Sequence, residues 1–119
     1  MSNRTKIIEE NLNVILPRSY KNFIDDTGII TNDNGEVFGY IEGMDIDKIP
    51  CVIGATKLYK KDYKNISENE IIISFDDFEN LPIVLNTKDG SVYNVDFDKK
   101  TQINSNFTEW LNQRLRELK

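Results

Sequence analysis

The chain has 119 residues, with 20 acidic and 15 basic side chains, no histidine and one cysteine, so its formal net charge is −5. A chain of this length buries roughly two thirds of its unfolded surface in one core, which predicts a single domain over residues 1–119. The missing histidines remove the commonest general base and metal ligand, and the negative charge disfavours direct binding of nucleic acid. Cys51 has no partner for an internal disulfide, and no apolar segment is long enough for a signal peptide or a membrane span. We therefore expect a soluble cytoplasmic protein with no membrane partner.

Two helices separated by a proline are predicted at the N-terminal end. The first covers roughly Thr5 to Leu12 and ends at Asn13, because asparagine tolerates a left-handed conformation. Pro17 cannot continue a helix but suits the first turn of a new one, so the second helix is expected from Pro17 to Thr27. Gly28 then stands where a left-handed C-cap is needed. The apolar faces of the two helices comprise Ile7, Ile8 and Leu12 in the first and Tyr20, Phe23, Ile24 and Thr27 in the second.

Residues 29–63 first show a strand pattern and then a helical one. Two short runs, 29–31 and 36–41, flank Asn34-Gly35, which predicts a β-hairpin. The acidic turn resembles a calcium loop, but the first and twelfth ligand positions would be Ile30 and Ile41, so calcium is not expected. From Ile49 or Pro50 to about Tyr63, apolar residues recur at helical spacing and favour a helix, although Gly54 weakens that pattern.

The C-terminal half is predicted to hold three strands and a closing helix. The strands are expected at 71–75, 82–86 and 92–97, and a turn at Lys88-Asp89-Gly90 joins the last two as a hairpin. Asn106 caps the helix, with Glu109 three residues later. Its apolar face comprises Phe107, Trp110, Leu111, Leu115 and Leu118. The expected fold is α+β, with N-terminal and C-terminal helices packed on one face of a mostly antiparallel sheet.

Several of these motifs occur in an order that resembles the SUKH superfamily. They are Leu12-x-Val14-x-Leu16-Pro17 followed by Tyr20 and Phe23, the hairpin Asp89-Gly90-x-Val92-Tyr93, and the closing Phe107-x-x-Trp110-Leu111. The resemblance covers nearly the whole chain, although Asn13 stands where a glycine is usual and the chain is short for the superfamily. It implies a single SUKH-like domain and, for the best understood members, a bacterial immunity protein that neutralises a toxin.

The sequence offers no arrangement typical of an enzyme or a cofactor site. Without histidine, no serine or cysteine is activated in the usual way, and the adjacent pairs Asp25-Asp26 and Asp76-Asp77 point apart on a helix or a strand. No paired-cysteine zinc site or phosphate loop is present, so we expect no catalytic residue, no metal and no cofactor. Core packing explains the spacing of Tyr20, Phe23, Tyr93 and Trp110. Three further aromatic residues near acidic segments are candidate interface anchors, namely Tyr40, Tyr59 and Tyr63.

Carboxylates gather in two segments, 22–47 and 65–87, that contain no lysine or arginine. They are either solvated loops or, if the segments meet, a negative surface that attracts a cationic partner. The candidate partner-binding residues are Asp25, Asp26, Asp33, Glu36, Glu42, Asp45, Asp47, Asp76, Asp77 and Glu79.

The function implied by the resemblance is immunity: the protein binds a cognate protein toxin and blocks it without catalysis. The acidic segments favour a toxin that acts on nucleic acid, since such a toxin needs a cationic cleft. Two alternatives stay open at this point. One is an intracellular adaptor or regulatory domain without a toxin partner, and the other is a small-molecule-binding domain, which would need a sizeable apolar pocket.

Overall fold

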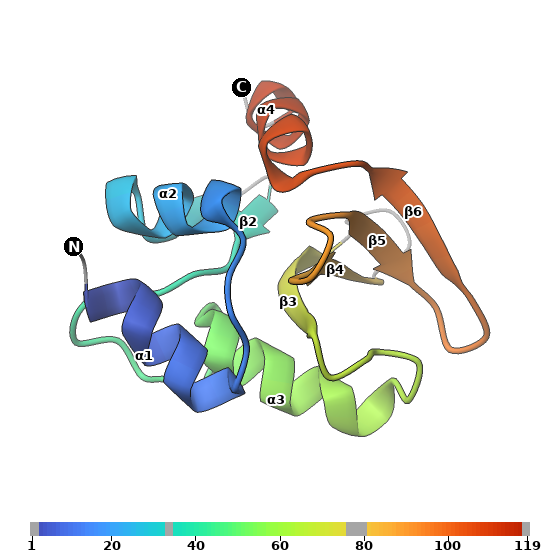
Figure 1. Ribbon diagram of the computed structural model, residues 1–119, viewed down its shortest axis with the longest axis horizontal. Coiled ribbons are helices and arrows are strands. Elements are labelled where there is room, and N and C mark those ends of the chain that lie inside the picture. Colours follow the sequence, from blue (N-terminus) through green and yellow to red (C-terminus); the bar gives the residue numbers. More distant parts are fainter. Residues whose placement is uncertain (1–2, 33–34, 76–80, 118–119) are drawn as a thin grey trace.

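The computed structural model describes residues 3–32, 35–75 and 81–117, and within these ranges the chain forms four helices and six strands. The helices are α1 (Asn3–Leu12), α2 (Arg18–Asp26), α3 (Val52–Asp62) and α4 (Phe107–Glu117). The strands are β1 (Ile30–Asn32), β2 (Gly35–Val37), β3 (Glu70–Phe75), β4 (Pro82–Asn86), β5 (Val92–Val95) and β6 (Lys100–Asn104). Figure 1 shows α1 and α2 together at one side of the main sheet, with α3 running past β3. The α+β class and the antiparallel sheet are confirmed.

The helix boundaries at the N-terminal end follow the residues that predicted them. Asn13 has a φ of 55° and ends α1, and Pro17, with a φ of −66°, is the N-cap of α2. Gly28 has a φ of 85° just after α2, as its left-handed role requires. Ile8 in α1 is buried, as are Tyr20, Phe23 and Ile24 in α2, whereas Thr27 is an exposed C-cap residue and does not join that face.

The first hairpin is present but shorter than predicted. β1 pairs antiparallel with β2 in a small sheet of its own, and the turn residues Asp33 and Asn34 lie outside the described ranges. The described pairing ends at Val37, and the chain then crosses Gly28 so closely that a Cβ on Gly39 would overlap the Gly28 carbonyl oxygen. The Phe38 N–H instead donates to the Ile73 carbonyl at 2.7 Å, so this segment runs beside β3.

The main sheet has the strand order β3-β4-β5-β6, and all its neighbours are antiparallel. The three predicted strands are confirmed, and Gly90, with a φ of 81°, occupies the predicted turn. Strand β6 was not predicted, because its sequence Lys-Thr-Gln-Ile-Asn is polar and none of its residues is buried. Residues 49–63, whose pattern favoured a helix, do form α3, which buries its first turns against β3.

Aromatic rings join α2, α4 and the segment after β2. The ring centroids of Tyr20 and Phe107 lie 5.0 Å apart, edge to face, and the Tyr20 hydroxyl donates to the Phe38 carbonyl at 2.6 Å. Trp110 is 4% exposed and lies 5.8 Å from Phe107. The core role predicted for these rings is therefore confirmed, whereas Tyr93 is only half-buried.

The closing helix differs from prediction on one face. The Glu109 N–H donates to Asn106 Oδ1 at 2.9 Å, which confirms the cap. Arg114, not Leu115, continues the buried face, because seven residues make nearly two turns and bring Arg114 below Phe107. Its Nη2 donates to Ser74 Oγ and to the Phe75 carbonyl, both at 3.3 Å. Leu115 is exposed, and Leu118 lies outside the described residues.

Candidate functional site

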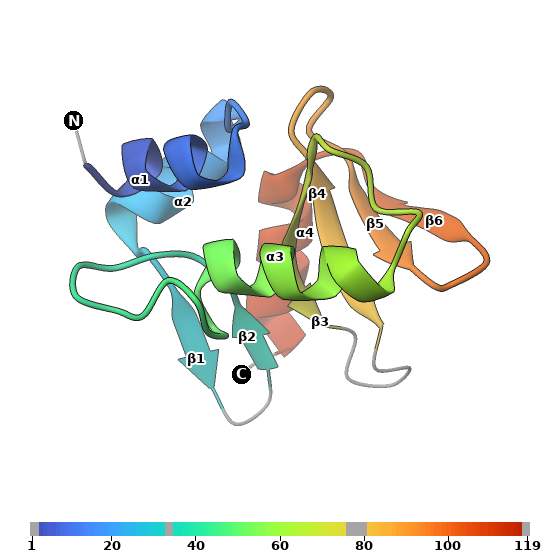
Figure 2. The ribbon, with the colours of Figure 1, turned by 90° about the horizontal axis from the view of Figure 1, so that it is seen from below.

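The loop between Tyr40 and Cys51 is held at both ends by backbone hydrogen bonds. The Tyr40 N–H donates to the Gly28 carbonyl at 3.0 Å, and the Val52 N–H donates to the Gly39 carbonyl at 2.9 Å. Gly54 in α3 lets the loop lie close, since a Cβ there would be 2.5 Å from the Lys48 nitrogen. The loop therefore sits on a fixed base formed by the end of α2 and the start of α3. Figure 2 shows it at the end of the molecule where α1 begins.

Five of the predicted carboxylates lie at this end of the molecule, and we call them the acidic end. All five side chains are exposed, two at the end of α2 and three in the loop: Asp25, Asp26, Glu42, Asp45 and Asp47. Arg4 links the two groups, because both Glu42 and Asp25 raise the pKa of its guanidinium, with the hydrogen bond to Glu42 as the largest cause. The structure thus brings together residues that are separated by the whole first hairpin.

Basic residues from outside the 22–47 segment neutralise part of this charge. Arg4 donates two hydrogen bonds to Glu42, from Nε to Oε2 and from Nη2 to Oε1, both at 2.9 Å. These hydrogen bonds lower the pKa of Glu42 from its usual value. Lys48 forms an ion pair with Asp45, with Nζ 4.0 Å from Oδ2. Within the described ranges, Asp25, Asp26 and Asp47 have no ion pair within 4.0 Å, although the charge of Arg4 acts on Asp25.

The other predicted residues are not brought to the acidic end by the described structure. Glu36 lies on β2 and is half-buried, and its carbonyl accepts a hydrogen bond from the Ser74 hydroxyl at 2.5 Å. The β1–β2 hairpin that carries it projects away from the loop (Figure 2). Four further residues lie outside the described ranges: Asp33, Asp76, Asp77 and Glu79.

Glu70, in the second acidic segment, has a structural role instead. It is 1% exposed, and its Oε1 accepts hydrogen bonds from Lys100 Nζ at 2.5 Å and from the Ser67 N–H at 2.9 Å. The two charged residues stand on β3 and β6, at opposite edges of the main sheet. Although no basic residue is near Glu70 in sequence, the fold supplies one.

The three tyrosines considered as interface anchors have different environments. Tyr40 is 8% exposed and belongs to the core. Tyr59 packs edge to face on Phe75, with centroids 4.8 Å apart. Tyr63 stacks on Phe97 at 4.4 Å, and Phe97 is 66% exposed. Phe97 was predicted inside a strand, but β5 ends at Val95, which places its ring at the surface.

The described residues offer little for metal or thiol chemistry. Among them, no group of three potential metal ligands is found, and no helix is long and apolar enough to cross a membrane. Cys51 is buried at the start of α3, and burial raises the pKa of its thiol. A raised pKa keeps the thiol protonated and unreactive.

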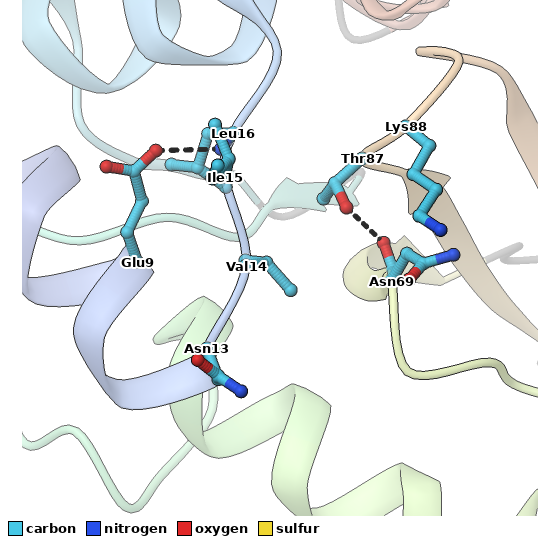
Figure 3. A pocket seen from close by; sticks show the side chains of 8 residues that line it. All are labelled: Glu9, Asn13, Val14, Ile15, Leu16, Asn69, Thr87 and Lys88. Atoms are coloured by element: carbon cyan, nitrogen blue, oxygen red, sulfur yellow. Dashed lines mark hydrogen bonds between the residues drawn. The ribbon is translucent and has the colours of Figure 1, made fainter.

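A pocket of about 510 Å³ lies between the α1–α2 connection and the loops that flank β3 and β4 (Figure 3). Sequence reasoning missed it, because its walls come from three separate segments. Its lining residues are Glu9, Asn13, Val14, Ile15, Leu16, Asn69, Thr87 and Lys88. Five of these eight residues are polar or charged, although most of the surface that faces the pocket is apolar.

Comparison with known families decides the classification of this architecture. The model of the SMI1/KNR4 family (SUKH-1) matches residues 3–113. The chain belongs to the SUKH-1 family. This match confirms the resemblance that the N-terminal, hairpin and closing motifs indicated. A search among curated proteins finds no match to the chain.

The motifs of this SUKH-1 domain are mostly structural. Leu16, Tyr20, Val92 and Trp110 are buried, and Asn13 supplies the left-handed turn for which glycine is usual. SUKH proteins include toxin immunity proteins, which act by binding a protein partner.

Proposed function

We propose that this SUKH-1 domain is an immunity protein that binds a cognate bacterial toxin in the cytoplasm and neutralises it without catalysis. The family match supports the class of function, and the acidic end supports the kind of partner. The proposed toxin acts on nucleic acid, as a nuclease or a related enzyme. The domain itself needs no cofactor for this role, since occupying the toxin's substrate cleft is sufficient.

The acidic end suits a cationic cleft for electrostatic reasons. Asp25, Asp26 and Asp47 are exposed and have no ion pair within the described structure, so their field reaches the solvent. An enzyme that binds nucleic acid presents lysine and arginine side chains to phosphates, and carboxylates satisfy the same groups. Such contacts speed association, and salt weakens them because exposed charges are screened within about 8 Å at physiological ionic strength.

The proposed contact surface extends beyond the acidic end. Glu36 on β2 contributes a further carboxylate, and the segments that contain Asp33, Asp76, Asp77 and Glu79 are proposed to complete the negative surface. The core of the proposal is the group of three exposed carboxylates without ion pairs in the described structure, two at the end of α2 and one in the anchored loop.

The proposal is tested by searching the neighbouring genes for a toxin and co-expressing that toxin with this protein. The test variant is Asp25→Lys/Asp26→Lys/Asp47→Lys, which spares Asp45 because its Oδ1 accepts the Asp47 N–H at 2.9 Å. Lysines at the end of α2 favour the helix dipole, so folding should be retained. The matched control is Asp62→Lys/Glu68→Lys/Asp98→Lys, with the same charge change on exposed residues elsewhere. Circular dichroism verifies the fold of both variants.

We expect the wild type and the control variant to protect cells, and the test variant to lose protection. The association rate of the wild type should fall as salt rises, and the test variant should associate at least tenfold more slowly at low salt. Equal protection by both triple variants, with an association rate indifferent to salt, would show that the acidic end is only solvated. A gene without a neighbouring toxin gene would instead favour the adaptor function.

A further inference from the structure

One wall of the pocket is the connection Asn13–Leu16, which lies between α1 and α2 without helical or strand pairing. Glu9 fixes it, because its backbone carbonyl accepts the Val14 N–H at 3.3 Å and its Oε2 accepts the Leu16 N–H at 2.8 Å. Ile15, between these two anchored residues, is 78% exposed. Within the described residues, no hydrogen bond engages the Ile15 N–H, so a strand-like donor and an aliphatic side chain are both presented to solvent.

The facing wall is equally fixed. The Asn69 carbonyl accepts hydrogen bonds from the Thr87 N–H at 2.9 Å and from its hydroxyl at 2.5 Å. The Asn86 side chain accepts the Lys88 N–H at 2.9 Å, which fixes the start of the turn. Figure 3 shows Val14 pointing across the gap toward Asn69 and Lys88. The gap therefore separates two constrained segments, and a ligand meets little cost of ordering them.

The lining of the pocket contains one carboxylate and one ammonium group, and only the carboxylate is already compensated. Glu9 is compensated by the Leu16 N–H and by Lys21, whose Nζ lies 3.6 Å from Oε2. Lys88 is exposed and has no ion pair with any described residue. A ligand therefore meets one available ammonium group, amide groups from Asn13 and Asn69, and the aliphatic surface of Val14 and Ile15.

From these features we propose that the pocket binds an extended peptide segment of a partner protein, with an aliphatic side chain against Val14 and Ile15 and a carboxylate on Lys88. A peptide suits the pocket better than a compact metabolite, because the unpaired Ile15 N–H and the amides match the spaced polar groups of a peptide backbone. This contact is separate from the acidic end, since Arg4 and Asn13 stand at opposite ends of α1. It holds for either a toxin or an adaptor partner.

Titration of the full chain with short peptides, followed by ¹⁵N NMR, tests the inference. The probe is the blocked peptide Ac-Val-Glu-Val-Glu-NH₂, and the charge-reversed probe is Ac-Val-Lys-Val-Lys-NH₂. N-acetyl-leucinate, a small molecule with the same aliphatic and carboxylate groups, distinguishes a metabolite from a peptide. The variants are Lys88→Glu and Ile15→Ala, both at exposed side chains, and the matched control is Lys57→Glu, which is exposed on α3.

We expect saturable shifts at residues 13–16, 69, 87 and 88 with the acidic peptide and none there with the basic one. Lys88→Glu should weaken binding about fivefold, the upper range for a single exposed charge contact, and Lys57→Glu should leave it unchanged. Ile15→Ala should weaken it by a smaller factor. The inference is refuted if the acidic peptide gives no saturable shift at these residues up to 5 mM, if Lys88→Glu binds it as well as the wild type, or if N-acetyl-leucinate binds as tightly as the peptide.

Discussion

The ion pair between Glu70 and Lys100 predicts a strong asymmetry between its two partners. Glu70 is 1% exposed, whereas the side chain of Lys100 is 26% exposed and lies over the Tyr93 ring, with Nζ 5.7 Å from the centroid. Lys100→Met keeps the packing of the aliphatic stem but leaves a buried carboxylate whose remaining described hydrogen-bond donor is the Ser67 N–H, with the charge of Lys60 acting on it without a described hydrogen bond. Breaking a buried pair in this way costs about 3–5 kcal/mol, and the partial exposure of Lys100 places the expected loss near 3 kcal/mol.

The reverse change should be mild. Glu70→Gln keeps an oxygen for the Ser67 N–H and leaves a partly exposed ammonium that water hydrates, so we expect a loss of about 1 kcal/mol. The double variant leaves no buried charge without its partner. Its loss of unfolding free energy should therefore be about 2 kcal/mol smaller than the sum of the two single losses.

Urea unfolding at pH 7, followed by Trp110 fluorescence and circular dichroism, measures these free energies. For a domain of this size, the Lys100→Met loss corresponds to a decrease in Tm of about 10 °C. Arg116→Met, an exposed basic residue on α4, serves as the control and should change the free energy of unfolding by less than about 0.5 kcal/mol. A Lys100→Met variant as stable as the control, or strictly additive single losses, would refute the assignment of Glu70 as a buried, lysine-dependent carboxylate.

Two further predictions concern the core and the first turn. Trp110→Ala should lower the free energy of unfolding by about 3–5 kcal/mol, because the ring is 4% exposed and packs on Phe107; unchanged thermal melting would contradict this placement. Asn13→Ala should destabilise by about 1 kcal/mol because its φ is 55°, whereas Asn13→Gly should be nearly neutral; equal losses in urea unfolding would show that the conformation is not the cause.

The sequence predicts this fold best where a residue has only one local role. Asn13, Pro17 and Gly28 mark the ends of α1 and α2 because each is suited to a backbone conformation that few other residues adopt. Strand β6 escaped prediction because an edge strand needs no buried alternation, and its five residues are mostly polar.

The surfaces were less predictable because they depend on contacts between distant residues. The exposed carboxylates near residues 25 and 45 are evident from charge alone, but Arg4, 38 positions from Glu42, could not be assigned to that carboxylate from sequence. Likewise, Lys100 is 30 positions from Glu70. The pocket combines residues from three segments, and no pattern within any one of them indicates a cavity.

The loop Ile41–Pro50 leaves and rejoins the fold at almost the same place, because Gly39 and Cys51 form a parallel bridge. The sequence and length of a loop closed on such a base can vary at little cost in stability, since the entropy of closure changes only slowly with loop length. Substitutions, insertions and deletions in this loop should therefore leave the core and its stability unchanged. On the function that we propose, partner choice diverges in such a loop while the scaffold stays the same.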